Sequence, residues 1–513
     1  MTGTTKAQDS NKTVIWILGI AAFAAVIFDF FRLLPLFDAF FIRDDYLFLD
    51  LGAFMRQQDP LAFLTATCIG WWRPIALLLP ALGYLVFGFN PLPFHVLAYI
   101  IHLLTGLVLV ILCRKFFDLK VGLIAFTIYI TSPISFSNVG WMLGAIEDET
   151  ATLFYLLALF TQFRINAEQQ KGPYILPAIF LVLGSFCKIT WLGLIPVMLY
   201  MDWVNYPKSR LAQRFLRFAP FPIFIPTLFL NLLFIGFDHL GGSFMPNFIT
   251  FFTANNLIKG AFFAFIPIDV FQHISDWFYL MLLIPVVFFL FALILNVKKR
   301  LVISIGVAFV GTLAILGLAQ IQKDPVGWVM GWRHLTPLIG FAAILVSLII
   351  VGLIKRLKLH IAGWGMAIVL LAAYIYSGLP MKGNIGEEVA KEEQNNRLEI
   401  RNFVALCRSF PIGSELYIIG KKPASVNLLA DLVGNDYELF MVFVKSRYTR
   451  LMHNYDARSK HVIYEESKRI AELLDELINN TNARFIGLNQ DGLWTDLTDN
   501  SKYQLGSLLR LQY

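Results

Sequence analysis

Long blocks of apolar residues alternate with short polar segments along the first three quarters of the chain. Blocks such as "ILPAIFLVLGSFC" and "LMLLIPVVFFLFALILNV" approach the roughly 20 residues that a helix needs to cross a hydrocarbon core of about 30 Å. The pattern predicts eleven membrane-spanning helices, at 14–35, 93–113, 121–137, 149–165, 173–187, 189–204, 218–237, 278–297, 301–321, 334–354 and 360–379. We therefore expect an all-α polytopic membrane protein.

Two connections between these spans are long, at 36–92 and 238–277. Each contains an apolar stretch, at 74–90 and 251–271, and Pro80, Gly83 and Gly88 interrupt the first of them. Such interrupted stretches favour helices that lie at the membrane interface over full spans.

After residue 380 the pattern changes to charged and mixed sequence. Short β-rich runs at 415–420, 439–444 and 483–489 predict strands, and 465–480 predicts an amphipathic helix. Alternating strands and helices indicate a small α/β domain. We therefore divide the chain into a transmembrane domain, 1–379, and a C-terminal α/β domain, 380–513, which lacks a glycine-rich phosphate loop and receives no catalytic role.

The charged residues orient the spans. The chain is 57% hydrophobic and 15% charged, with a net charge of +7. Lys and Arg concentrate in alternate loops, including 208–217, 298–300 and 355–358. Cytoplasmic loops carry an excess of these residues, so we expect a cytoplasmic N-terminus and an extracytoplasmic C-terminal domain. We expect the protein to reside in the cell inner membrane. The positive charge is thus explained without a nucleic-acid partner.

This topology brings unusual polar residues to the outer face from distant parts of the sequence. Carboxylates follow the first span and precede the fourth, and cations lie between the fifth and sixth spans and at the start of the tenth. These residues are Asp44, Asp45, Glu147, Asp148, Glu149, Lys188, Arg333 and His334.

Each of these residues also has a structural explanation. Adjacent aspartates after a span are often solvated, and acids before a helix can cap its N-terminus. Arg333 could be an interfacial anchor, and Trp72 could belong to an aromatic belt. His95 and His102 are more simply packed or hydrogen-bonded residues than metal ligands. Lys188, between two apolar runs, is harder to explain structurally, because a cation near membrane depth needs a partner or a task.

A catalytic interpretation explains these residues together. A carboxylate above the membrane can deprotonate an acceptor hydroxyl as a general base, and nearby cations can hold a phosphate and stabilise its developing charge. No nucleotide-binding fingerprint is present. We therefore expect an activated substrate that is carried on a lipid phosphate. The four cysteines lack metal-ligand spacing, and although the outer carboxylates could hold a divalent cation, no spacing requires one.

The sequence resembles the membrane glycosyltransferases of the GT-C fold, in particular the protein O-mannosyltransferase-like branch. The resemblance is carried by "DDY" after the first span, Arg73-Pro74, Gly88-Phe89-Asn90-Pro91, His95 and His102, together with "VGWMLGAIEDETATLFYLLAL", "CKITWLGLIPVMLYMDW" and "WRHLTP". It covers 14–204 well and 325–340 weakly. The chain departs from the family pattern at Ala145, Ile189 and His334, which stand in place of an arginine, an acid and a tyrosine.

The resemblance implies an inverting transferase that moves mannose or another hexose or pentose from a polyprenyl phosphate to a hydroxyl of a protein, lipid or glycan. Asp44 would be the general base, assisted by Asp45, and Glu147 would line the pocket. Lys188, Arg333 and His334 would contact the lipid phosphate. Substrate-lining residues would be Arg73, Trp72, His95 and Asp148. No cofactor is required.

Two other classes remain open at this stage. A flippase for lipid-linked sugars would need charged groups along a path through the membrane midplane. A non-catalytic assembly protein would leave Asp44, Lys188 and Arg333 without a shared role.

Overall fold

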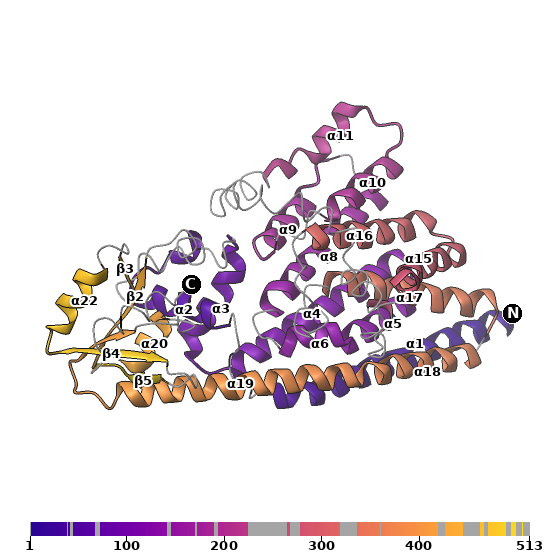
Figure 1. Cartoon of the computed structure of the whole chain (residues 1–513). Coiled ribbons are helices and arrows are strands. Elements are labelled where there is room, and N and C mark those ends of the chain that lie inside the picture. The colour runs from indigo at the N-terminus through magenta and orange to yellow at the C-terminus, as the bar shows by residue number, and fades with distance from the viewer. Residues whose placement is uncertain are drawn as a thin grey trace. The chain divides into compact units, whose positions relative to one another are not determined.

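The structure is a computed structural model, and most of its described residues are helical (Figure 1). The described residues are 2–37, 39, 41, 45–66, 72–140, 145–169, 172–188, 193–223, 264–266, 278–318, 336–359, 361–418, 426–434, 436–444, 462–465, 470–488, 494–498 and 505. The chain divides into two compact units. The helical unit comprises Met1–Asp38, His95–Phe229 and Phe237–Glu388, and the sheet unit comprises Ala39–Phe94, Leu230–Gly236 and Val389–Tyr513.

The helical unit contains the apolar segments that the hydropathy pattern predicts as spans. Its helices are α1 (Thr2–Leu33), α4 (Leu92–Phe116), α5 (Leu119–Thr131), α6 (Pro133–Gly140), α8 (Thr150–Ala167), α9 (Ile175–Ser185), α10 (Ile195–Asn205), α11 (Leu211–Phe218), α15 (Phe278–Leu295), α16 (Lys299–Leu318), α17 (Thr336–Arg356) and α18 (Ile361–Ser377). Every predicted span except 218–237 coincides with one or two of these helices. Most of 218–237 lies outside the described residues.

Several of these helices can cross a membrane. Among the described residues, four segments are both long and apolar enough to do so: Lys12–Leu36, Leu92–Phe116, Thr336–Arg356 and Ala362–Cys407. Large apolar side chains remain exposed on outer helix faces, such as Trp16 and Phe23 on α1. Exposure of this kind is unfavourable in water and natural in hydrocarbon. The chain is a multi-pass membrane protein.

Helix α17 forms the centre of the helical unit. It packs against α5, α15 and α16, and Leu338, Phe341 and Leu345 on it are almost fully buried. A helix that is apolar around its whole circumference belongs in such a central position. Helix α1 lies along α5 and also contacts α18, so segments from opposite ends of the helical sequence run side by side (Figure 1).

The sheet unit contains a five-stranded sheet. The strands are β1 (Glu415–Ile418), β2 (Glu438–Val444), β3 (Val462–Glu465), β4 (Ala483–Leu488) and β5 (Trp494–Asp496). Their order is β3-β2-β1-β4-β5, and every neighbouring pair is parallel except β4 and β5. The expected α/β domain is therefore present. The sequence pattern predicts β1, β2 and β4 and misses β3 and β5.

Helices complete the sheet unit: α2 (Asp45–Gln57), α3 (Pro74–Phe87), α19 (Leu379–Cys407), which belongs to this unit from Val389 onward, α20 (Val426–Val433) and α22 (Ile470–Ile478). The predicted interface helix at 74–90 corresponds to α3, which ends at Phe87 and is followed by Gly88, where φ is +59°. Most of the second, 251–271, lies outside the described residues. The segment Ala39–Phe94, part of the transmembrane domain predicted from the sequence, is assigned to the sheet unit.

Candidate functional site: a buried polar cluster in the helical unit

Three consecutive acids occupy one widened helical turn in the helical unit. The π-helical segment Ala145–Glu149 directly precedes α8, and Glu147, Asp148 and Glu149 on it are all buried. Single π-helical turns within α-helices occur frequently at functional sites. Burying ionised carboxylates is costly unless partners compensate the charge, so the partners of these acids define the cluster.

Asp148 forms an ion pair with Lys188. The ammonium group of Lys188 contacts a carboxylate oxygen of Asp148, and both side chains are buried. Lys188 follows α9, its backbone N–H donates to the Gly184 carbonyl at 2.8 Å, and its own carbonyl accepts from the Tyr155 hydroxyl. Asp148 directly precedes α8 and Lys188 follows α9, and these two helices pack against each other. The structure thus brings together two of the residues that the sequence analysis selects.

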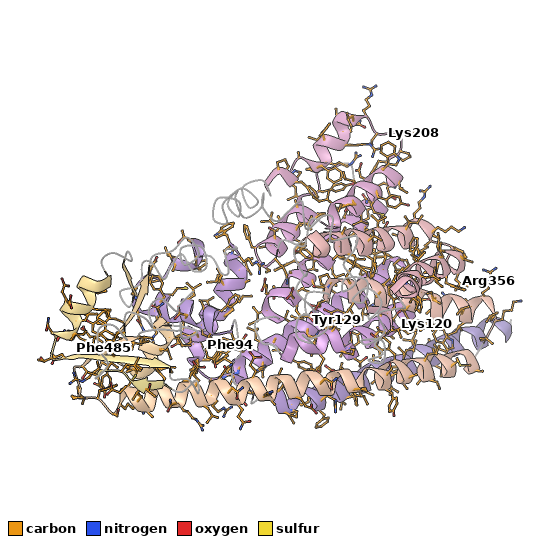
Figure 2. The ribbon with its side chains drawn as sticks, viewed as in Figure 1. Phe94, Lys120, Tyr129, Lys208, Arg356 and Phe485 are labelled. Carbon is orange, nitrogen blue, oxygen red and sulfur yellow. The ribbon has the colours of Figure 1, made fainter. Side chains whose placement is uncertain are left out.

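Glu149 is bound by two side chains from other helices. One of its carboxylate oxygens lies 3.0 Å from His102 Nδ1, and the other accepts a hydrogen bond from the Tyr129 hydroxyl. The His102 and Tyr129 rings stack with centroids 5.2 Å apart. Figure 2 labels Tyr129 on α5 within this unit. All three side chains are buried, so α4, α5 and the acidic turn meet at one polar centre.

Another buried ion pair of the helical unit involves α1. Asp29 on α1 accepts from Lys382 Nζ at 2.7 Å, and the Lys382 ammonium lies 5.1 Å from the centroid of the Phe136 ring. Spacing along the first span suggests instead that Asp29 pairs with Arg32 on the same helix. That interpretation is wrong, because Asp29 faces the interior of the unit while Arg32 is exposed.

His95 also lies in the helical unit. It is buried, and its ring stacks on Phe37 with centroids 6.4 Å apart. Its role as a substrate-lining residue stays a prediction.

The remaining selected residues that the structure describes belong to the sheet unit. Asp45 begins α2 and is buried, as is Tyr46 beside it. Burial raises the pKa of the Tyr46 phenol, and the negative charges of Asp45 and Glu399 raise it further, so Tyr46 stays protonated. Trp72 Nε1 donates to the Leu64 carbonyl at 2.8 Å, and Arg73 occupies the position before α3.

Three selected residues lie outside the described part of the chain, namely Asp44, Arg333 and His334. The roles expected for these three residues stay predictions. Within the described residues, no group of three or more His, Cys, Asp or Glu side chains could hold a metal ion.

Sequence reasoning selected the acidic turn and Lys188, but it did not find the partners of Glu149. His102 lies with His95 on an otherwise apolar helix, and Tyr129 lies with Thr127 and Thr131 on another. Neither carries a local signal of its partner.

No protein-family profile matches the sequence, and no curated protein is similar to it in sequence. Structural similarity is nevertheless extensive. The crystal structure of ArnT from Cupriavidus metallidurans bound to undecaprenyl phosphate is similar with a TM-score of 0.54 and 12% sequence identity, over 93% of each chain.

The chain has a GT-C fold. The apo structure of the same ArnT gives a TM-score of 0.51 at 11% identity, over 95% of this chain and 94% of ArnT. An oligosaccharyltransferase from Archaeoglobus fulgidus, with a TM-score of 0.42, 12% identity and coverage of 95% of this chain and 73% of its own, is too distant to support an argument. At these identities the similarity establishes the fold alone.

Proposed function

We propose that the protein is a glycosyltransferase that moves a sugar from a polyprenyl-phosphate donor to an acceptor hydroxyl at the outer face of the inner membrane. The observation that carries this proposal is the shared GT-C fold over nearly the whole of both chains with an ArnT structure that holds undecaprenyl phosphate. The buried acids and cations of the helical unit, a costly arrangement in a membrane protein, support an active site in this fold.

In the proposed reaction, the acceptor oxygen attacks the anomeric carbon from the face opposite the phosphate. The bond between that carbon and the phosphate oxygen breaks, and the polyprenyl phosphate leaves with the electron pair. Asp44 takes the hydroxyl proton as general base, with Asp45 assisting. One displacement of this kind inverts the anomeric configuration.

Cations at the leaving group would stabilise the charge that develops on it. We assign this role to Lys188, Arg333 and His334. Lys188 already has a fixed position beside Asp148, so it can meet the phosphate with little reorganisation. Glu147, buried one residue before Asp148, would line the pocket. The sugar is a hexose or pentose, and the O-mannosyltransferase-like branch stays a prediction.

A flippase for lipid-linked sugars is the competing function. The low charge of the predicted spans argues against a flippase, yet the structure contains buried charged pairs, such as Asp29 on α1 with Lys382 on α19. Experiment separates the two functions, since a transferase releases polyprenyl phosphate and a flippase returns its lipid intact.

The test uses purified protein in nanodiscs with a panel of radiolabelled polyprenyl-phosphate sugars and hydroxyl acceptors of the three classes, protein, lipid and glycan. We expect acceptor-dependent release of polyprenyl phosphate with one donor. Movement of intact donor between leaflets without release, across the whole panel, would reject the transferase in favour of the flippase.

A further inference from the structure

Helix α20 in the sheet unit has two faces with different partners. Leu429 and Val433, four residues apart, pack into the core formed by β1, β2, β4 and the end of α19. Asn427 and Asp431, also four residues apart, lie on another side of the helix and contact α2. One short helix therefore connects the sheet with the helix that begins at Asp45.

The N-terminus of α20 is occupied by a side chain from α2. Asp50 accepts from the Leu428 backbone N–H at 2.9 Å and from Asn427 Nδ2 at 3.0 Å, and Asp50 is buried. The first N–H groups of a helix lack partners within the helix and attract anions. Here a carboxylate 378 positions away in the chain satisfies one of them.

The other end of α20 is held by a second acidic contact. Asp431 accepts from Arg56 Nη2 at 2.7 Å and from Gln57 Nε2 at 3.2 Å, both at the end of α2. It also accepts from the hydroxyl of Tyr84 on α3, a residue that is almost fully buried. Hydrogen bonds to charged groups are stronger than neutral ones, so α20 is bound at both ends.

Asp50 contacts the N-terminus of α20, a position where sheets of this topology can bind a ligand. In doubly wound folds with the strand order 3-2-1-4, a nucleotide phosphate binds at the N-terminus of the helix that follows the first strand. The sheet here has that order, and α20 is the helix between β1 and β2. The place of a phosphate is taken by the Asp50 carboxylate.

We propose that the C-terminal sheet is a clamp on α2, and that Asp50, Tyr84 and Asp431 are positioning residues for the acid pair at the start of that helix. Asp45 is the first residue of α2, and Asp44 immediately precedes it. A helix bound along its length through α20 has few ways to tilt or shift. The inference that this affects catalysis rests on the proposed transferase function, whereas the clamp itself does not.

The clamp is tested by amide hydrogen exchange on the full-length protein in nanodiscs. Tyr84→Phe removes only the hydroxyl that donates to Asp431, so we expect about tenfold faster exchange in α2 and α20, the effect of losing one hydrogen bond to a charged group. The matched control is Tyr417→Phe, which removes a buried hydroxyl of the same sheet that donates to Glu415 at 2.7 Å. The control leaves exchange in α2 unchanged.

The catalytic part is tested by steady-state transfer with the donor identified for the wild-type protein. Tyr84→Phe and Asp431→Asn each lower kcat about tenfold with KM for the donor unchanged, since small misplacements of reacting groups cost up to about 100-fold. The double variant is no worse than the more severe single variant, because both act on one contact. Tyr417→Phe keeps wild-type kcat.

The outcomes are distinguishable. Unchanged exchange in α2 of the Tyr84→Phe protein would overturn the clamp. Faster exchange with wild-type kcat would overturn the positioning role while leaving the clamp in place. Absence of transfer by the wild-type protein with every donor would reject the proposed function, and the exchange result would still decide the clamp.

Discussion

Asp29 and Lys382 form a buried ion pair with an oxygen–nitrogen distance of 2.7 Å, although 353 positions separate them in the chain. The pair joins α1 to the first turn of α19, and both side chains are almost completely buried. Each partner compensates the buried charge of the other, so removing only one of them is expected to lower the stability of the fold.

Replacing one partner of the Asp29–Lys382 pair is expected to destabilise the fold strongly. Lys382→Met leaves a buried carboxylate without its cation and lowers the free energy of unfolding by about 3–5 kcal/mol. The double variant Asp29→Leu/Lys382→Met removes both charges and recovers most of that loss. Thermal unfolding in detergent measures both effects. A double variant as unstable as Lys382→Met would contradict the pairing.

Lys188 has two proposed roles, as the partner of Asp148 and as a contact for the donor phosphate, and variants can distinguish them. Lys188→Met is expected to lower kcat/KM for the donor about 100-fold, as loss of one preorganised stabilising group does. If Lys188 only neutralised Asp148, the double variant Lys188→Met/Asp148→Leu would regain activity. We expect it to keep the loss of about 100-fold and to fold stably. The matched control, Lys355→Met, removes a lysine from an exposed pair with Asp118 and is expected to retain activity.

The contact between α8 and α9 requires a glycine. A Cβ at Gly184 would lie 2.4 Å from the Tyr155 ring, whereas one at Gly365 on α18 would meet nothing within 4 Å. Gly184→Ala is therefore expected to destabilise the fold by about 1–3 kcal/mol. Gly365→Ala, the control, is expected to stabilise its helix by up to about 1 kcal/mol. Thermal unfolding of the two variants checks the sign, and equal effects would contradict the close packing.

Asp118 gives the protein a pH-dependent contribution to stability. Burial opposes ionisation, but the hydrogen bonds from Lys355 Nζ at 2.9 Å and from the Lys120 N–H at 3.1 Å outweigh it, and the pKa of the carboxyl lies below its usual 3.8. A depressed pKa stabilises the fold above the unfolded value, and this stabilisation is lost as pH falls through the folded value.

Asp118→Asn should therefore be less stable than wild type at pH 7, and the difference should shrink below about pH 4. Asparagine keeps the oxygen that caps α5, so the comparison isolates the charge. Unfolding temperatures from pH 7 to pH 3 measure this. A constant difference over that range would show that the charge makes no contribution.

Much of the helical architecture could be predicted from the sequence. An apolar run of the length of Thr336–Arg356 has few alternatives in a membrane protein, and the structure has a helix there. Strand β5 was missed because it contains three residues, too few for an alternating pattern. Strand β3 was missed although its four residues equal β1 in length, because β1 is the start of the longer β-rich run 415–420.

The partners of buried polar groups could not be predicted. The spacing along the helix suggests Arg32 as the partner of Asp29. The actual partner, Lys382, reaches Asp29 only through the packing of α19. The contact of Asp50 with α20 likewise depends on a sheet that forms from sequence far away. Asp148 and Lys188 could both be selected because the membrane topology places their loops on the same face. This topology relates distant segments and can be predicted from the sequence.

The proposed transfer begins with proton removal by Asp44, and a kinetic comparison of two variants can reject this role. Asp44→Asn and the matched control Asp59→Asn, a change of the same kind two residues after the end of α2, are assayed with the donor that the wild-type protein accepts. We expect Asp44→Asn to lose about 100-fold or more in kcat, within the range for a general base, while it inserts and folds normally. We expect Asp59→Asn to stay active. Wild-type turnover by Asp44→Asn would contradict this role for Asp44.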